Sequence, residues 1–322
     1  YEGRQVANVI ADPPGLATNT TPYIIGAHYD SVSGTPGADD NASGVAVLLR
    51  VAAGLAQPDD ADKPLKRHVL FAAWSGEELG LLGSSWWVDH AAAPHSSENS
   101  VAKQVVAYLN FDMVGRLRDN KLTLQGVGSS SAWKKLIERR NVLAGFDLTL
   151  QQDPYLPTDT TSFYPKGIPV LAWFSGSHKE YHRPSDDTAT LNFEGLERIT
   201  KFAGNIVRDL ARGGDRPDYL KVEKSNQGGD RDAIRVYLGT IPDYASEDVK
   251  GVLLTGVRGG GPADKAGLKG GDVIVHFAGR EITNIYDYTY ALDAVKVGEP
   301  VGIEVLRKGK RMKLSIIPAT RK

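Results

Sequence analysis

The chain has no cysteine among its 322 residues, and this absence narrows the classes of protein to which it can belong. It excludes a disulfide-stapled scaffold, a thiolate zinc finger and a cysteine nucleophile. It does not identify a compartment, because cytosolic and exported proteins can both lack cysteine. No metal bound by this chain can have a thiolate ligand.

Long apolar runs are also missing. No uninterrupted stretch reaches the roughly 18 residues that a membrane span needs, so we expect no membrane span in this chain. The best candidate, residues 44–56, is interrupted by Arg50 and predicts an amphipathic or buried helix. The sequence starts at Tyr1 without a signal-peptide pattern, so we expect any targeting segment to lie outside it.

An excess of charge of either sign is absent as well, since 38 Lys and Arg oppose 39 Asp and Glu. This balance argues against nucleic acid as a partner. It is nevertheless an average over two unlike parts. Residues 1–215 carry 20 basic and 25 acidic side chains, or −5, whereas residues 216–322 carry 18 and 14, or +4. The shift in composition predicts two domains with different roles.

The first part alternates buried-strand patterns with helical ones. This order predicts an α/β sandwich whose largely parallel sheet is covered on both faces. The expected strands are residues 23–27, 69–74, 105–111 and 168–174, and the expected helices are residues 45–55, 78–87 and 194–211.

The second part has short β patterns separated by Gly-rich turns. We predict a larger first domain over residues 1–212, a linker over 213–230, and a small β-rich domain over 231–322. Within the small domain we expect strands at residues 234–238, 251–257, 272–277, 301–306 and 313–317, and one helix at residues 285–294.

Polar side chains capable of binding metal follow every expected strand of the first part. In open α/β sheets the carboxyl ends of the strands form the ligand crevice. Histidines and carboxylates that meet there suit a hard or borderline divalent metal. The candidates are His28 and Asp30, then Asp39 and Asp40, then Glu77 and Glu78, then Asp112, and finally His182.

Glu77 and Glu78 are adjacent and therefore point in different directions, so they can do two jobs. One can bind a metal while the other accepts a proton from water. Two neighbouring acids are costly unless cations neutralise them or one holds a proton. A hydrolase with two metals about 3.5–4 Å apart also needs a bridging carboxylate, which Asp40 or Asp112 could supply.

Five motifs in this order resemble the M28 family of zinc aminopeptidases. The resemblance covers about residues 5–212 and implies a three-layer sandwich with a mostly parallel mixed sheet. The motifs are His28-Tyr29-Asp30-Ser31, Asp39-Asp40-Asn41-Ala42-Ser43-Gly44, Glu77-Glu78-Leu79-Gly80-Leu81-Leu82-Gly83-Ser84, Asn110-Phe111-Asp112-Met113 and Tyr181-His182-Arg183-Pro184-Ser185-Asp186.

The resemblance implies a role for each matching residue. His28 and Asp112 look like ligands of one Zn²⁺ ion, Glu78 and His182 look like ligands of a second, and Asp40 looks like the bridge between them. Glu77 looks like the general base that deprotonates a water shared by the two ions. Asp30 looks like the carboxylate that orients His28, and Tyr181 like a hydrogen-bond donor to the oxyanion. The segment Thr158-Asp159-Thr160-Thr161-Ser162-Phe163 lacks a histidine that the family has, which puts the details of the substrate pocket in doubt.

The second part resembles a PDZ domain. The resemblance rests on Tyr237-Leu238-Gly239-Thr240, on Gly261-Pro262-Ala263-Asp264-Lys265-Ala266-Gly267-Leu268 and on Gly270-Gly271-Asp272-Val273-Ile274. It implies that the backbone amides around Leu238 and Gly239 can hold the C-terminal carboxylate of a peptide while the peptide adds a strand to the sheet. The alternative is a PDZ fold that serves only for docking or packing.

These features predict a two-zinc aminopeptidase that acts on peptide substrates. One alternative is another enzyme on the same fold, such as a glutaminyl cyclase or a carboxypeptidase. The other is a peptide-binding scaffold whose catalytic domain is inactive. Relatives often carry a signal peptide, so the resemblance also implies export to the periplasm, the cell surface or the medium.

Overall fold

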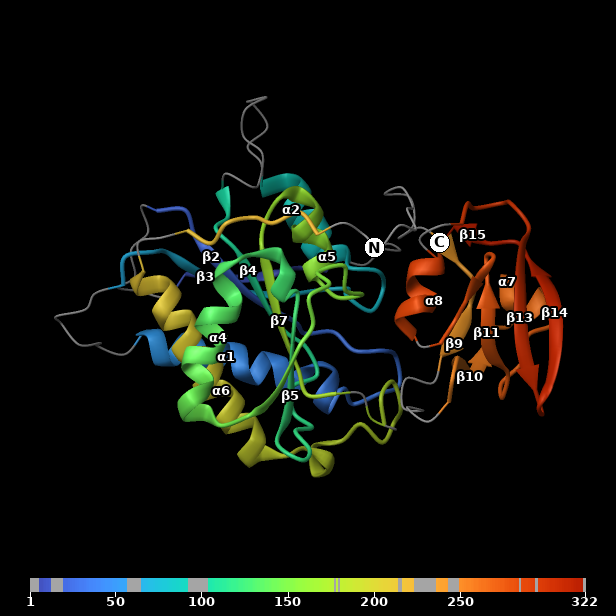
Figure 1. Cartoon of the computed structure of the whole chain (residues 1–322), viewed down its shortest axis with the longest axis horizontal. Helices are drawn as coiled ribbons and strands as arrows, with labels where there is room; N and C mark the ends of the chain where they lie inside the picture. The colour runs from blue at the N-terminus through green and yellow to red at the C-terminus, as the bar shows by residue number, and fades with distance from the viewer. Residues whose placement is uncertain are drawn as a thin grey trace. The chain divides into compact units, whose positions relative to one another are not determined.

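The chain forms two compact units in the computed structural model (Figure 1). The first unit contains residues 1–176 and 182–222, and the second contains residues 177–181 and 223–322. The structure describes residues 6–12, 20–56, 65–91, 104–176, 178, 180–213, 216–222, 236–242, 249–283, 285–292 and 295–320.

A seven-stranded mixed sheet runs through the first unit in the order β1-β3-β2-β4-β7-β5-β6. The central strands β3, β2, β4 and β7 are parallel, whereas β1 pairs antiparallel with β3 and β5 antiparallel with β7. The strands are β1 (Val9–Ala11), β2 (Tyr23–His28), β3 (Val69–Trp74), β4 (Tyr108–Phe111), β5 (Lys121–Gln125), β6 (Asp147–Leu150) and β7 (Val170–Phe174). The helices are α1 (Gly44–Ala56), α2 (Leu82–Ala91), α4 (Ala132–Ala144), α5 (Thr160–Phe163) and α6 (Phe193–Arg212).

Helices cover both faces of this sheet (Figure 1). Successive side chains of a strand point to opposite faces, and β2 follows this rule. Tyr23 and Ile25 belong to the core formed with α1, α4 and α6, whereas Ile24 belongs to the core formed with α2 and α5. All six residues of β2 are buried. The three-layer α/β sandwich with a mostly parallel mixed sheet is therefore confirmed.

One expected helix begins later than the sequence pattern indicates. The pattern predicts a helix from Glu78, but α2 starts at Leu82. Gly76 and Gly80 have positive φ angles of 71° and 106°, which turn the chain before the helix can begin. Glu78 therefore lies in a turn rather than in the first turn of a helix.

The pattern also misses β5, β6 and α4. Strand β6 has only four residues and alternates exposed with half-buried positions, so it carries no buried run. Helix α4 contributes Trp133, Leu136 and Ile137 to the core, but its exposed Val142 and Leu143 blur the apolar periodicity. Neither β6 nor α4 directly follows a buried strand that can be seen in the sequence.

The second unit is a small β-rich domain with its own core. Its main sheet has the order β14-β13-β11-β10-β9, with β12 paired to β11, and a second sheet pairs β15 with β8. Leu254, Ile274, Phe277, Tyr288 and Val305 are among the side chains buried between the main sheet and its helices. The elements are β8 (Val236–Tyr237), β9 (Thr240–Pro242), β10 (Val252–Val257), α7 (Pro262–Lys265), β11 (Val273–Phe277), β12 (Arg280–Glu281), α8 (Ile285–Leu292), β13 (Val301–Arg307), β14 (Lys310–Ile316) and β15 (Ala319–Thr320).

Part of the expected linker packs on the first unit. Asp218 accepts a hydrogen bond from the hydroxyl of Ser130 (2.6 Å), and the backbone N–H of Val222 donates to the hydroxyl of Tyr164 (2.7 Å). Residues 216–222 therefore extend the first unit, whereas residues 223–230 lie outside the described residues. The domain boundaries at 212 and 231 remain predictions.

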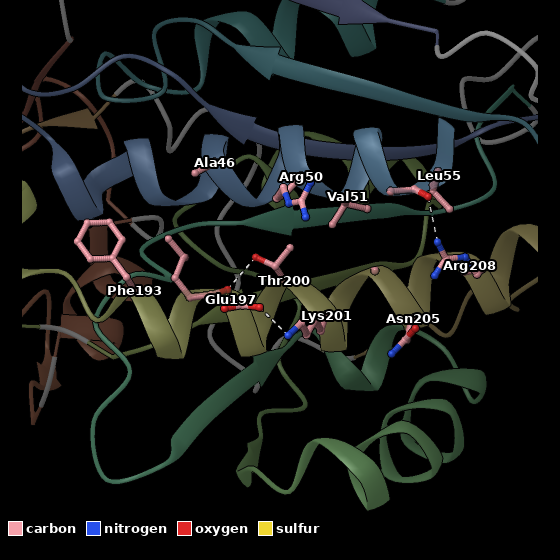
Figure 2. A pocket seen from close by; sticks show the side chains of 13 residues that line it. Ala46, Arg50, Val51, Leu55, Phe193, Glu197, Thr200, Lys201, Asn205 and Arg208 are labelled. Atoms are coloured by element: carbon pink, nitrogen blue, oxygen red, sulfur yellow. Dashed lines mark hydrogen bonds and ion pairs between the residues drawn. The ribbon is translucent and has the colours of Figure 1, made fainter. Parts of the chain in front are cut away.

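Helix α6 is amphipathic, with Ile199, Phe202 and Ile206 buried against the sheet. Its other side, together with α1, lines a groove of about 370 Å³ (Figure 2). All of the lining residues belong to these two helices, so the groove contains none of the candidate site residues. Among the described helices, none has the length and apolar character needed to cross a membrane.

Ile206 offers a test of the core of the first unit, because its side chain is fully buried on the side of α6 that packs into this core. We expect Ile206→Ala to lower the free energy of unfolding of the first unit by about 2–5 kcal/mol, through lost burial and the cavity left behind. All five tryptophans lie in the first unit, so urea unfolding followed by tryptophan fluorescence reports on that unit. Val142→Ala on the exposed face of α4 is the control and should change the value by less than about 0.5 kcal/mol.

Candidate metal centre

His28 is the last residue of β2 and points one ring nitrogen toward the other candidate ligands. Its Nδ1 donates to the backbone carbonyl of Asp30 (3.0 Å). A proton held on Nδ1 leaves Nε2 as the nitrogen with a free lone pair, which is what a metal ligand needs. Nε2 lies 3.2 Å from Oδ1 of Asp40 and 3.5 Å from Oδ1 of Asp112.

Asp40 lies between two histidines. Its Oδ1 is 3.2 Å from Nε2 of His28, and its Oδ2 is 3.0 Å from Nε2 of His182. Asp40 belongs to the helical turn η1 (Ala38–Ser43), which precedes α1, and it is almost fully buried. A carboxylate whose two oxygens face two separate nitrogens has the arrangement required to bridge two cations.

Two further carboxylates complete the groups on either side of Asp40. Asp112 follows β4 and faces His28, whereas Oε2 of Glu78 lies 3.1 Å from Nε2 of His182. Ligand atoms of His28, Asp40 and Glu78 all lie within 4.8 Å of one another. The structure thus brings together all five residues that the sequence nominates as metal ligands.

The electrostatics of this cluster fit a cation. Burial opposes protonation of His182, but hydrogen bonds and charges from Asp40 and Glu78 outweigh it and raise its pKa to about 9. Burial likewise opposes protonation of His28, while Asp112 and Glu77 raise its pKa overall. A metal ion bound between the histidines and these acids would neutralise the same negative charges.

The carboxylates respond to the same environment in two ways. Burial raises the pKa of Glu78 and of Asp112, because the charged form is poorly solvated. Burial acts on Asp40 in the same direction, but hydrogen bonds from His182 and His28 hold its pKa well below the usual range. Asp40 is therefore the most firmly anionic member of the cluster.

Asp30 joins the ends of β2 and β3. Its Oδ1 accepts the backbone N–H of Glu77 (3.1 Å) and its Oδ2 accepts that of Glu78 (3.3 Å). The distance from its Oδ1 to Nδ1 of His28 is longer, at 3.7 Å. The backbone carbonyl of Asp30 thus orients the His28 ring, whereas its carboxylate holds the segment that carries the two glutamates.

Asn41 holds Asp112 from both sides. Its Nδ2 donates to the carbonyl of Phe111 (2.9 Å), and its Oδ1 accepts the N–H groups of Met113 (3.3 Å) and Gly44 (3.0 Å). Asn41 has no role that the sequence alone assigns. The one feature of the sequence that could have drawn attention to Asn41 is its position directly after Asp40.

Glu77 lies beside the cluster and is not one of its close contacts. Burial raises its pKa well above the ordinary value, and the negative charges of Asp112 and Asp159 raise it further, although His28 acts in the opposite direction. Asp159 is itself fully buried, and burial raises its pKa to about 7. The sequence pointed to the segment around Asp159 but not to a second buried acid near Glu77.

Tyr181 belongs to the segment grouped with the second unit. Its backbone N–H donates to the carbonyl of His178 (3.1 Å), which forms the turn before His182. The oxyanion role of Tyr181 remains a prediction.

Leu238 and Gly239 form the connection between β8 and β9 of the second unit. The Leu238 side chain is buried, and Gly239 has a φ of 74°, which a residue with a Cβ adopts only with strain. Among the described residues, strand β9 is one of the two edge strands of the main sheet and pairs on one side only, with β10.

The model of peptidase family M28 matches residues 8–207, which is more than half of the chain. The chain belongs to peptidase family M28. A PDZ domain model matches residues 222–317, in agreement with the β-rich second unit.

Curated relatives of this M28 chain carry aminopeptidase names. Aminopeptidase YwaD of Bacillus subtilis is 31% identical over 216 residues, covering 63% of this chain and 44% of its own. Leucine aminopeptidase 2 of Trichophyton rubrum is 28% identical over 240 residues, covering 66% and 46% respectively. The chain therefore spans about half the length of the curated relatives it matches.

A solved structure gives the same assignment for the fold. The zinc aminopeptidase BSAP of Bacillus subtilis has a TM-score of 0.53 at 28% identity, covering 66% of this chain and 52% of its own.

The role of Asn41 in the M28 unit can be tested by stability. We expect Asn41→Ala to lower the free energy of unfolding by about 1–3 kcal/mol, because it leaves buried backbone groups of Phe111, Met113 and Gly44 without a partner. The same tryptophan-detected urea unfolding measures it. Asn205→Ala, the same exchange at an exposed position of α6, should have little effect. Equal stability of the two variants would contradict the role assigned to Asn41.

Proposed function

We propose that this chain is a two-zinc aminopeptidase that removes residues from the amino termini of peptides. The observation that carries the proposal is the position of Asp40, whose two oxygens face Nε2 of His28 and Nε2 of His182. The names of the relatives support the choice of reaction and substrate, because the relatives named above are called aminopeptidases.

The donor set fits zinc. One ion would be held by His28, Asp112 and Oδ1 of Asp40, and the other by His182, Glu78 and Oδ2 of Asp40. Imidazole nitrogens and carboxylate oxygens are ordinary zinc ligands, and catalytic sites use few protein ligands so that a position stays open. When bound, the two ions would polarise the scissile carbonyl and lower the pKa of the attacking water.

Glu77 supplies the proton chemistry in this proposal. It accepts a proton from the attacking water and delivers it to the nitrogen of the leaving amine, so it must both gain and lose a proton in each turnover. A raised pKa suits this task, because a general base works best when its pKa lies near the working pH. The bonds from Asp30 to the backbone of Glu77 and Glu78 fix the base and one ligand at adjacent positions.

The position of Asp40 also separates the proposal from its rivals. A cyclase of this fold that uses one zinc has no need of a carboxylate shared between two histidines. An inactive scaffold has no need of a complete ligand set with a neighbouring base. A carboxypeptidase differs in the end of the substrate that it recognises, so peptides blocked at one end or the other distinguish it.

Replacing Glu77 tests the reaction. We expect Glu77→Gln to retain two zinc ions per chain but to lower kcat on aminoacyl chromogenic substrates by about 10²–10⁴-fold, because an amide cannot accept the proton. Metal content is measured by atomic emission alongside the kinetics. Glu138→Gln, the same exchange at an exposed position of α4, is the control and should keep full activity.

Several results would overturn parts of the proposal. Full activity of the Glu77 variant would remove the assigned base. One zinc per chain in the unaltered protein would favour a one-metal enzyme. Zinc bound with no hydrolysis of aminoacyl chromogenic substrates or of peptides blocked at either end would favour the inactive scaffold.

We further propose that the second unit binds the C-terminal carboxylate of a peptide. The turn at Leu238 and Gly239 leads directly into β9, which is an edge strand of the main sheet in the part of the chain that the structure describes. Successive backbone N–H groups in such a turn can hold a carboxylate while the peptide pairs with the edge strand.

Export of the chain remains a prediction.

Gly239→Ala tests this carboxylate site. A Cβ at position 239 would lie 2.9 Å from the hydroxyl of Tyr237, and the φ of 74° would be strained, so we expect peptide affinity to fall at least about 10-fold. The probes are peptides with apolar C-termini and an N-terminal fluorophore, which also blocks aminopeptidase action, and binding is read by anisotropy. Gly279→Ala has a similar φ of 79° but no atom near its Cβ, so it is the control. Equal binding of C-terminal amides and free acids would contradict the carboxylate site.

A further inference from the structure

Asp186 connects two segments of the first unit that lie far apart in the sequence. Its Oδ1 accepts the backbone N–H of Asp39 (3.0 Å), and its Oδ2 accepts those of Asp39 (3.1 Å) and Asp40 (3.1 Å). Its backbone carbonyl accepts the N–H of Ala38 (3.2 Å). The side chain is buried, with 1% of its surface exposed. All four contacts go to the turn that carries Asp40.

The other end of this connection is His182, four residues earlier. The N–H of Asp186 donates to the carbonyl of Arg183 (3.0 Å), which closes a turn directly after His182. His182 itself has a φ of 54°, an unfavourable value for a residue with a Cβ. A strained backbone of this kind persists only where its surroundings hold it in place. Asp186 supplies such a restraint next to His182.

His182 and Asp40 contact each other, and each comes from one of the two segments that Asp186 joins. Nε2 of His182 lies 3.0 Å from Oδ2 of Asp40, and no strand pairing joins their segments, because His182 lies between β7 and α6 and Asp40 between β2 and α1. A carboxylate that accepts backbone N–H groups makes stronger bonds than a neutral acceptor does. The negative charge of Asp186 is therefore suited to keep Asp40 and His182 at a fixed separation.

We propose that Asp186 is a positioning residue for metal binding, which holds His182 and Asp40 in place for the ion that these two residues share with Glu78. The inference rests on the proposed two-zinc function. It assigns no contact between Asp186 and the metal. Asp186 acts through the backbone of Asp39 and Asp40 and through the turn after His182.

The experiment compares Asp186→Asn with Asp187→Asn in the full chain. Asp187 is the adjacent residue, is exposed, and caps the short helix η4 (Thr188–Thr190) by accepting the N–H of Ala189 (2.9 Å). Both variants therefore remove one negative charge and one acceptor from the same loop. Each protein is stripped of metal and titrated with zinc against a competing chelator.

We expect the Asp186 variant to bind one of two zinc ions about 10–100-fold more weakly, which is the usual effect of removing a group that orients a ligand. The Asp187 variant should stay within about 2-fold of the parent. Because zinc at high concentration refills a weakened site, kcat of the Asp186 variant should recover as zinc is raised. A purely structural role would lower the stability of the metal-free protein without changing zinc affinity.

The outcomes separate this inference from the proposed function. Unchanged affinity for both ions in the Asp186 variant overturns the inference and leaves the proposed function in place. A parent that binds two ions but hydrolyses no peptide overturns the proposed reaction, while the affinity comparison still decides the role of Asp186. A parent that binds no zinc overturns both. If the Asn variant does not fold, Asp186→Glu, which keeps the carboxylate but displaces it, is measured in the same way.

Discussion

The close packing of carboxylates around two histidines is the constraint on which the rest of the first unit depends. Asp40, Glu78 and Asp112 lie within contact distance of His28 or His182, and Glu77 lies beside them. Acids gathered in a buried site repel one another and lose solvation, so the arrangement requires either protons or cations. The pKa values of both histidines are raised for this reason, because the neighbouring acids favour a positive charge on each ring. In the function that we propose, two bound zinc ions would meet this requirement by neutralising the carboxylates.

A cluster of this kind must also be held in shape, and backbone hydrogen bonds do so in the same manner at three points. Asp30 binds the N–H groups of Glu77 and Glu78, Asn41 binds the chain on both sides of Asp112, and Asp186 binds the N–H groups of Asp39 and Asp40. None of the three is among the metal ligands we assign. Each instead joins one ligand-bearing segment to another, so the site depends on a frame of polar side chains as well as on the sheet.

The central strands, and the gathering of histidines and carboxylates at their ends, could be predicted from the sequence, because both leave a local signal. A strand such as Val69–Trp74 is an apolar run of strand length, and motifs such as His28-Tyr29-Asp30 follow such runs directly. Strand β6 and helix α4 leave no comparable signal, because their positions depend on pairing and packing with distant elements. The same holds for Asn41, whose partners at Phe111 and Met113 lie about seventy residues away. A residue that acts through distant backbone groups cannot be assigned that role from its neighbours.

The charge balance of the whole chain acquires a physical meaning once the site is considered. Residues 1–215 carry 20 basic and 25 acidic side chains, a net charge of −5. Five of those acids, Asp30, Asp40, Glu77, Glu78 and Asp112, belong to the candidate metal centre. Two zinc ions would add +4 and bring the net charge of this part to −1. The acidic surplus is then a property of the buried centre rather than of the surface, which is why a chain with almost no net charge can still contain so concentrated an acidic site.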